Sequence, residues 1–186
     1  EKTSHGTHVS GTIAAGFDND TGISGVAPYV NLYTFPLSSS VVKDKNLFSQ
    51  ELLGMTALIE NEKCRVINAS ISAELNGVSL ALLIAMGEPD LDEAFSSLAD
   101  QMGKYLNRLL EIGNDFVICN SAGNDNNKGY TVDAFYTNFF SAIEDEEIKK
   151  HIIIVGACKN NGDGTFTYSN FSNVGDRVDV VAPGED

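Results

Sequence analysis

The fold class of this 186-residue chain follows from the run HIIIVGA at residues 151–157. It is the most apolar run of the chain, and its isoleucine and valine residues favour a strand that is buried on both faces. Five further β-rich runs are found at 29–35, 64–70, 115–121, 165–170 and 177–182. Apolar runs that alternate with helical patterns predict βαβ units, an α/β fold and a mostly parallel sheet.

Two helical patterns lie between these runs. Residues 46–62 have apolar side chains at the spacing of a helix, and residues 91–112 form the clearer pattern. The apolar face of the second pattern consists of Leu91, Phe95, Leu98, Met102, Tyr105, Leu106 and Leu109. Asp90 and Glu93 resemble a capping box at its start, and Gly113 is expected to end it.

The remaining local signals are a turn and one ambiguous segment. The turn sequence NGDG at 161–164 lies between two apolar runs and predicts a β-hairpin. Residues 78–86 are apolar nearly all round, so they form either a buried helix or a partly exposed insertion. The length and the lack of an internal repeat or linker predict one domain over residues 1–186.

Composition excludes several classes of partner. The chain has 12 Lys and Arg against 26 Asp and Glu, a net charge of −14, which disfavours nucleic acids and anionic membranes. Its apolar runs are far shorter than the roughly 20 residues of a membrane-spanning helix, so no membrane insertion is expected. Three cysteines cannot all pair with one another, and we expect them to be buried, reduced thiols.

The opening segment SHGTHVSGTIAA, residues 4–15, predicts a helix of small side chains that suits a close approach of backbones. His5 and His8 stand at its N-terminal end, where the helix dipole favours the neutral imidazole that a general base requires. A metal site on His5 and His8 is the alternative, and neither a third ligand nor an HExxH pattern accompanies it.

Four sequence motifs follow one another along the chain. They are HGTHVSGT at 5–12 with GISGVAP at 22–28, VINAS at 66–70, SAGN at 121–124, and FSNVG at 171–175 with VDVVAPG at 178–184. In this order they resemble the histidine segment, the substrate-binding strand, the oxyanion-hole segment and the stretch before the nucleophile of subtilisin-like serine proteases. The resemblance spans nearly the whole chain, except for residues 74–113 and 125–150, which are longer than the corresponding family loops and are expected to be insertions.

The resemblance implies a three-layer subtilisin-like fold and a serine endopeptidase with a Ser-His-Asp triad. His5 matches the catalytic histidine and Asn124 the oxyanion-hole amide, whereas His8 has no chemical role in the motif. Ser70, Ile71 and Ser72 match the edge where a peptide adds as an extra strand. Ala122 and Gly123 match further substrate-binding positions. Ser72 stands where the family often has glycine, so the specificity pocket is expected to differ in shape.

Two members of the triad have no counterpart in the sequence. The aspartate motif belongs upstream of His5, the serine motif belongs downstream of Gly184, and no serine of the chain has that context. We therefore expect the interior of a longer protease, with the aspartate strand and the serine helix absent and no activity of its own. A non-catalytic homologue that binds peptides in the retained groove is the alternative. A nucleotide-binding doubly wound domain would need a GxGxxG or P-loop motif, which the sequence lacks.

The resemblance also bears on cofactors, partners and compartment. No cofactor is required, although many relatives bind calcium where this chain has residues 16–22, and a solvated turn is the alternative there. The expected partner is a peptide or protein substrate. Self-association through open sheet edges at 29–35 and 64–70 is a further expectation. Family habit indicates secretion or the cell envelope, and unpaired cysteines leave an intracellular enzyme open.

Overall fold

The computed structural model describes residues 4–37, 47–71, 91–126, 131–136 and 139–185. These residues belong to two compact units, Glu1–Phe35 and Pro36–Asp186. The ambiguous segment 78–86, Asp90 of the expected capping box and Ser72 of the expected substrate edge lie outside the described residues. In the described part, no helix combines the length and the apolar character that crossing a membrane requires.

The first unit is built on the helix α1, Ser4–Ala14, which confirms the helix expected from the small residues of the opening segment. A later segment of the chain, residues 25–27, bonds to the last turn of this helix. The backbone N–H groups of residues 25–27 donate hydrogen bonds of 2.7–3.0 Å to carbonyl groups at its C-terminal end. A side chain at Gly25 would collide with the backbone nitrogen of Ala15, so this close approach requires glycine.

The expectation of a strand at 29–35 is wrong, because these residues belong to no sheet. Their side chains are largely exposed, 86% for Tyr29 and 51% for Val30. The β-rich composition predicts an extended backbone, but a strand also needs a hydrogen-bonded neighbour, and no strand pairs with this segment within the described residues.

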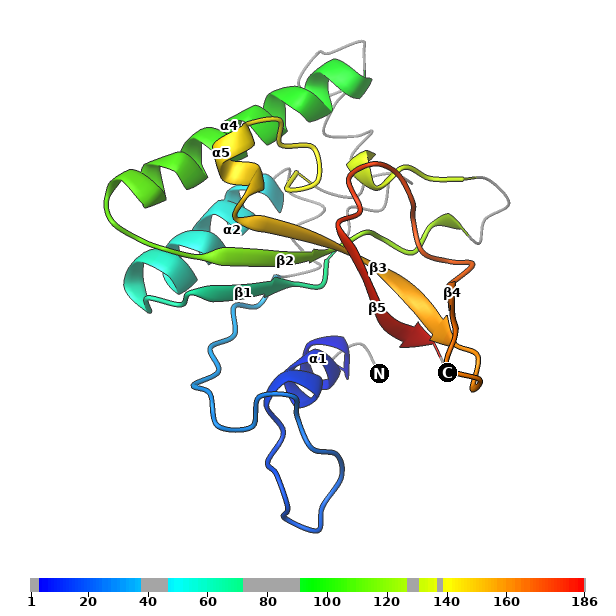
Figure 1. Cartoon of the computed structure of the whole chain (residues 1–186). Coiled ribbons are helices and arrows are strands. Elements are labelled where there is room, and N and C mark those ends of the chain that lie inside the picture. Colours follow the sequence, from blue (N-terminus) through cyan, green and yellow to red (C-terminus); the bar gives the residue numbers. More distant parts are fainter. Residues whose placement is uncertain (1–3, 38–46, 72–90, 127–130, 137–138, 186) are drawn as a thin grey trace. The chain divides into compact units, whose positions relative to one another are not determined.

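The second unit contains a five-stranded sheet, which confirms the α/β class and the mostly parallel arrangement (Figure 1). The strands are β1 (Val66–Ala69), β2 (Val117–Ser121), β3 (Ile152–Asn160), β4 (Phe166–Tyr168) and β5 (Val180–Glu185). Their order is β1-β2-β3-β4, with β5 also paired to β3, and only the β3–β4 pair is antiparallel. That pair is the expected hairpin, and Gly162 and Gly164 in its turn have φ of 79° and 86°.

The helices of this unit are α2 (Leu47–Met55), which continues as the π-helix η2 (Thr56–Asn61), then α4 (Leu91–Glu111), the 3₁₀ turn η4 (Ala134–Tyr136) and α5 (Glu146–Lys149). Helix α2 with η2, and helix α4, agree with the two predicted patterns, whereas the short η4 and α5 were not predicted. Helix α4 ends as predicted at Gly113, whose φ is 88°. The N–H of Gly113 bonds to the carbonyl of Leu110 at 2.9 Å and that of Asn114 to Leu109 at 3.1 Å, which is a Schellman motif.

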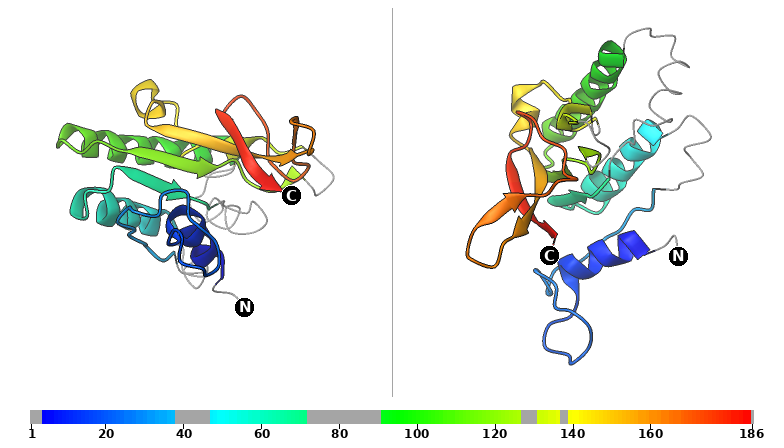
Figure 2. Two further views of the ribbon diagram at one scale, coloured as in Figure 1. Left: turned by 60° about the horizontal axis from the view of Figure 1, so that its bottom comes forward. Right: turned by 90° about the vertical axis from the view of Figure 1, so that its right-hand side faces the viewer.

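One face of the sheet carries the core. Parallel pairing places Ile67 beside Ile118 and Ile118 beside Ile152, and all three are buried. The apolar face of α4 packs in the same cluster, and the right-hand view of Figure 2 shows α2 and α4 on one side of the strands. The alternate side chains are half-buried or exposed, up to 69% for Val66. Within the second unit, the described helices α2 and α4 lie on one face of the sheet, and burial of the other face stays a prediction.

Candidate active site

The less covered face of the sheet carries a cavity of about 290 Å³. Strands β1, β2, β3 and β5 and the turn after β2 all contribute to its wall. The lining residues include Asn68, Ser70, Cys119, Ser121, Ala122, Gly123, Asn124, Val155, Ala157 and Gly184. Small and polar side chains thus replace the apolar ones of the opposite face, which leaves room and hydrogen-bonding groups for a ligand.

The turn after β2 presents Asn124 beside this cavity. The N–H of Ala122 bonds to the carbonyl of Val155 at 2.8 Å, so the chain stays attached to β3 one residue beyond the strand. Gly123 then takes a φ of 97°, a value that favours glycine. Ala122 and Gly123 are buried, whereas the following Asn124 is exposed. The backbone therefore turns outward at the residue that carries the candidate amide donor.

The segment that follows β1 is fixed by side chains of β2. The Oγ of Ser121 donates to the carbonyl of Ile71 at 3.1 Å, and the Nδ2 of Asn120 donates to the carbonyl of Ala69 at 2.8 Å. Asn68 donates from Nδ2 to the Oγ of Ser70 at 2.9 Å. Strand β1 stands at the end of the described sheet, and no described strand pairs with its outer edge. Such an edge can accept an extended peptide as a further strand.

A second chain segment supports the turn that presents Asn124. Asn173 is fully buried, its N–H donates to the carbonyl of Gly123 at 2.9 Å, and its Oδ1 accepts the N–H of Asp125 at 2.8 Å. The neighbouring Ser172 accepts the N–H of Ala157 at its Oγ at 3.0 Å, which ties the segment to β3. The turn is consequently held by hydrogen bonds to residues about 50 positions away.

The structure brings together most of the residues that the sequence proposed for the second unit. Ser70, Ala122, Gly123 and Asn124 line one cavity, and Ile71 adjoins it through its carbonyl. Ser72 lies outside the described residues. His5 lies in the first turn of α1, in the unit Glu1–Phe35, and its role as a base stays a prediction.

Three asparagines of the site were not predicted as functional residues. They are Asn68, Asn120 and Asn173. Asn68 and Asn173 are polar residues inside the VINAS and FSNVG motifs, and this was the available signal. The hydrogen-bond partners of Asn120 and Asn173 lie about 50 positions away, so the sequence does not indicate them.

The thiols do not contribute a nucleophile. Cys64, Cys119 and Cys158 are free, but only Cys158 is buried, so the expectation of three buried thiols was wrong. Burial raises the pKa of Cys119, and burial together with Glu62 raises the pKa of Cys64. A raised pKa favours the protonated thiol, which is a weaker nucleophile than the thiolate.

The calcium expectation at 16–22 stays a prediction. The N–H of Thr21 donates to the Oδ1 of Asn19 at 3.1 Å, so the Asn19 side chain stabilises the turn in which it lies. Over the described ranges, no group of three or more His, Cys, Asp or Glu side chains is placed to hold a metal ion.

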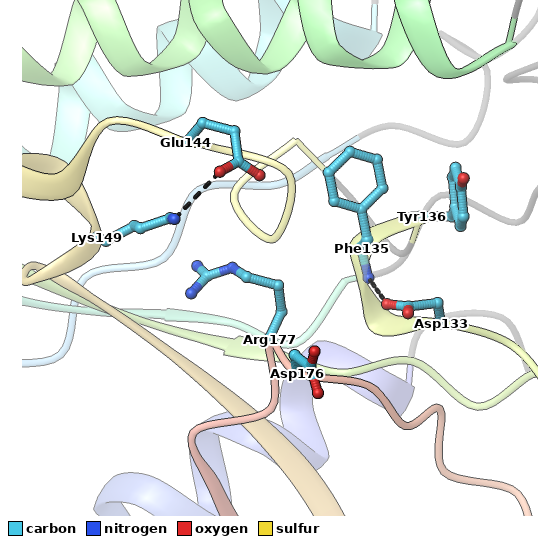
Figure 3. Close-up of a pocket in the computed structure, with 7 residues that line it drawn as sticks. All are labelled: Asp133, Phe135, Tyr136, Glu144, Lys149, Asp176 and Arg177. Carbon is cyan, nitrogen blue, oxygen red and sulfur yellow. Dashed lines mark hydrogen bonds and ion pairs between the residues drawn. The ribbon is translucent and has the colours of Figure 1, made fainter.

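A larger cavity of about 570 Å³ has a different character (Figure 3). Its lining residues are Asp133, Phe135, Tyr136, Glu144, Lys149, Asp176 and Arg177. Lys149 pairs with Glu144 at 3.2 Å, and the Nε of Arg177 donates to the carbonyl of Ser141 at 2.9 Å. None of these described lining residues belongs to the four sequence motifs, so the smaller cavity is the candidate active site.

A glycine turn that follows the parallel strand β2 and exposes an asparagine beside the cavity agrees with the SAGN and VINAS motifs. The sequence profile of the subtilase family matches residues 1–186. The chain belongs to the subtilase family.

Individual relatives agree with this assignment. This subtilase chain is 29% identical to Subtilisin NAT of Bacillus subtilis subsp. natto over 182 residues, which is 98% of the chain and 37% of that protein. It is 28% identical to Subtilisin DY of Bacillus licheniformis over 180 residues, 97% of the chain and 51% of the relative. A thermostable alkaline protease of Halalkalibacterium halodurans is 27% identical over 187 residues, 99% of the chain and 38% of the relative. The chain thus spans about half of these relatives or less.

Proposed function

We propose that this chain is part of a serine endopeptidase that hydrolyses peptide bonds with a Ser-His-Asp triad. Its own contributions are His5 as the general base and Asn124 as the oxyanion donor, and residues outside 1–186 supply the aspartate and the serine. The observation that carries the proposal is the exposed Asn124 on a hydrogen-bonded glycine turn beside a polar cavity. The family membership and the relatives named as subtilisins support it.

The roles follow from the chemistry of acyl transfer. When the serine hydroxyl attacks the scissile carbonyl, a neutral His5 accepts its proton and later returns a proton to the leaving amine. The carbonyl oxygen becomes an oxyanion, and the Nδ2 of Asn124 donates a hydrogen bond to it. Removing such a donor costs about 2.7–4 kcal/mol of transition-state stabilisation, a range that itself comes from a subtilisin.

The substrate peptide would bind as an extended strand along the segment that follows β1. The carbonyl of Ile71 is already oriented by Ser121, and Ser70 is oriented by Asn68. Main-chain hydrogen bonds supply affinity in this mode, while pockets for alternate side chains supply specificity. Ala122 and Gly123 carry no bulky side chain and leave the cavity open near Asn124.

The proposal is tested in a protein that carries this chain together with the triad aspartate and serine. We expect His5→Ala to lower kcat by several orders of magnitude, and Asn124→Ala to lower it about 10²- to 10³-fold, both with an unchanged fold. His8→Ala is the matched control and should keep most of the activity. Full activity of His5→Ala would remove His5 from the mechanism.

The 186-residue chain alone provides a second test. We expect no peptidase activity and no reaction with a fluorophosphonate probe, because no serine of the chain stands in the nucleophile motif. Stoichiometric labelling would contradict the proposed division of the triad. Binding of a peptide without cleavage by the longer protein would favour the non-catalytic homologue. Secretion or attachment to the cell envelope, and self-association through the outer edge of β1, stay predictions.

A further inference from the structure

Two peptide groups flank the Cα atom of Asn124, and Asn173 holds both. The carbonyl of Gly123 belongs to the peptide group before Asn124 and accepts the N–H of Asn173 at 2.9 Å. The N–H of Asp125 belongs to the peptide group after Asn124 and donates to the Oδ1 of Asn173 at 2.8 Å. Because these two groups define φ and ψ of Asn124, their hydrogen bonds fix the direction of its Cα–Cβ bond.

The turn needs such external support. Gly123 has no Cβ and takes a φ of 97°, so the residue before Asn124 is the one with the largest conformational freedom. Asn124 itself is exposed. A donor that stabilises an oxyanion must already point at the reacting oxygen before the negative charge develops. A glycine turn without further hydrogen bonds would not hold the donor in that orientation.

Asn173 is itself well anchored. It is fully buried, and its carbonyl accepts the hydroxyl of Tyr168 at 3.0 Å and that of Ser172 at 3.3 Å. Ser172 also bonds to the N–H of Ala157 in β3 at 3.0 Å. The connection therefore runs from the central strand through residues 172–173 to the turn that carries Asn124.

We propose that Asn173 is a positioning residue that fixes the orientation of Asn124 for oxyanion stabilisation. The inference rests on the proposed function of Asn124. Asn173 does not touch the reacting atoms, and it acts through the backbone on either side of Asn124. The side-chain Oδ1 is the part that substitution can remove, because the N–H bond to Gly123 survives any substitution other than proline.

The first experiment tests whether Asn173 holds the turn, in a protein that carries this chain together with the triad aspartate and serine. Amide hydrogen exchange is measured for Asp125 in the wild type, in Asn173→Ala and in the control Asn170→Ala, which removes an exposed asparagine side chain of the same segment. We expect exchange at Asp125 to become at least about tenfold faster in Asn173→Ala, and to stay within about twofold in the control. Asn173→Asp keeps an acceptor at the same place and is used if the alanine variant fails to fold, with protection at Asp125 expected to persist. Unchanged exchange in Asn173→Ala, or lost protection in a folded Asn173→Asp, overturns the proposal.

The second experiment is a double-mutant cycle in a protein that carries the complete triad. Asn173→Ala should lower kcat about tenfold or more with KM within about twofold, and it should have no further effect on kcat when Asn124→Ala is already present. An equal loss in both backgrounds shows a merely structural role and overturns the inference. If Asn124→Ala alone leaves kcat unchanged, the proposed function of Asn124 fails, and the exchange experiment still decides whether Asn173 holds the turn.

Discussion

The two faces of the sheet in the second unit use the same strands for opposite purposes. On one face Ile67, Ile118 and Ile154 are buried against the helices. On the other face, the residues in between include Ser121 and Val155, which line the candidate active site. Because successive side chains of a strand point to opposite faces, each strand contributes both to stability and to the site. Substitutions on the two faces should therefore separate stability from activity.

Among the described residues, Glu51 is the buried carboxyl group, and its titration should have the largest effect on the free energy of unfolding. Glu51 of α2 is 4% exposed, and burial raises its pKa from 4.5 to about 8. Below pH 4.5 the carboxyl is protonated in both states. Between pH 4.5 and 8 only the unfolded chain loses this proton, so the free energy of unfolding falls as the pH rises, and it stays low above pH 8.

The expected loss of unfolding free energy from this group is on the order of 5 kcal/mol across that window. Glu51→Gln should remove most of the pH dependence and stabilise the chain at pH 9, as urea unfolding at a series of pH values would measure. Glu93→Gln on the exposed side of α4 is the control and should leave the pH profile unchanged. A wild-type chain whose stability is flat from pH 5 to 9 would contradict the assignment.

A buried polar residue provides the next comparison. Asn120 lies on the buried face, where its Nδ2 bonds to the carbonyl of Ala69 while no described partner reaches its Oδ1. Asn120→Asp replaces this donor with a carboxylate and should cost roughly 3–5 kcal/mol of stability at pH 7. Asn124→Asp makes the same chemical change at an exposed position and should cost less than about 0.5 kcal/mol. Equal losses in chemical denaturation would show that the two faces do not differ as described.

Neighbouring isoleucines give the smallest of the three effects and the closest match in chemistry. Ile154 is fully buried, and Ile153 on the opposite face is half-buried. Ile154→Ala should lower the free energy of unfolding by about 3 kcal/mol, within the usual range for a filled core. Ile153→Ala should cost about 1 kcal/mol, because folding removes less apolar surface from water at Ile153 than at Ile154. A reversed order in urea titrations would break the assignment of the faces.

The elements that the sequence predicts well are those with local causes. Helix α4 has a regular apolar face and a glycine at its end, and both features are present in the structure. The hairpin between β3 and β4 follows from its glycine turn. The residues that form the wall of the site follow from matching the motifs, since VINAS covers β1 and SAGN begins at the last residue of the adjacent strand β2.

The features that the sequence does not predict depend on distant partners. Residues 29–35 have the composition of a strand, but composition does not say whether a neighbouring strand is available to pair. Similarly, Asn173 lies within the FSNVG motif, yet its contacts with the Gly123–Asp125 turn join positions about 50 apart. Such contacts become visible only once the fold has brought these segments together.

The way in which α1 is closed has a consequence for how the length of this protein can vary. The chain between the helix and residues 25–27 forms a loop whose two ends are fixed to each other by backbone hydrogen bonds. Inserted residues would be added to a loop that is already closed, and doubling its length would add only about 0.6 kcal/mol of closure entropy. A deletion that removed Gly25 would instead take away the residue that permits the contact. Homologous chains should accordingly differ in the length of the loop between α1 and residue 25, and the number of residues directly after residue 25 should stay constant.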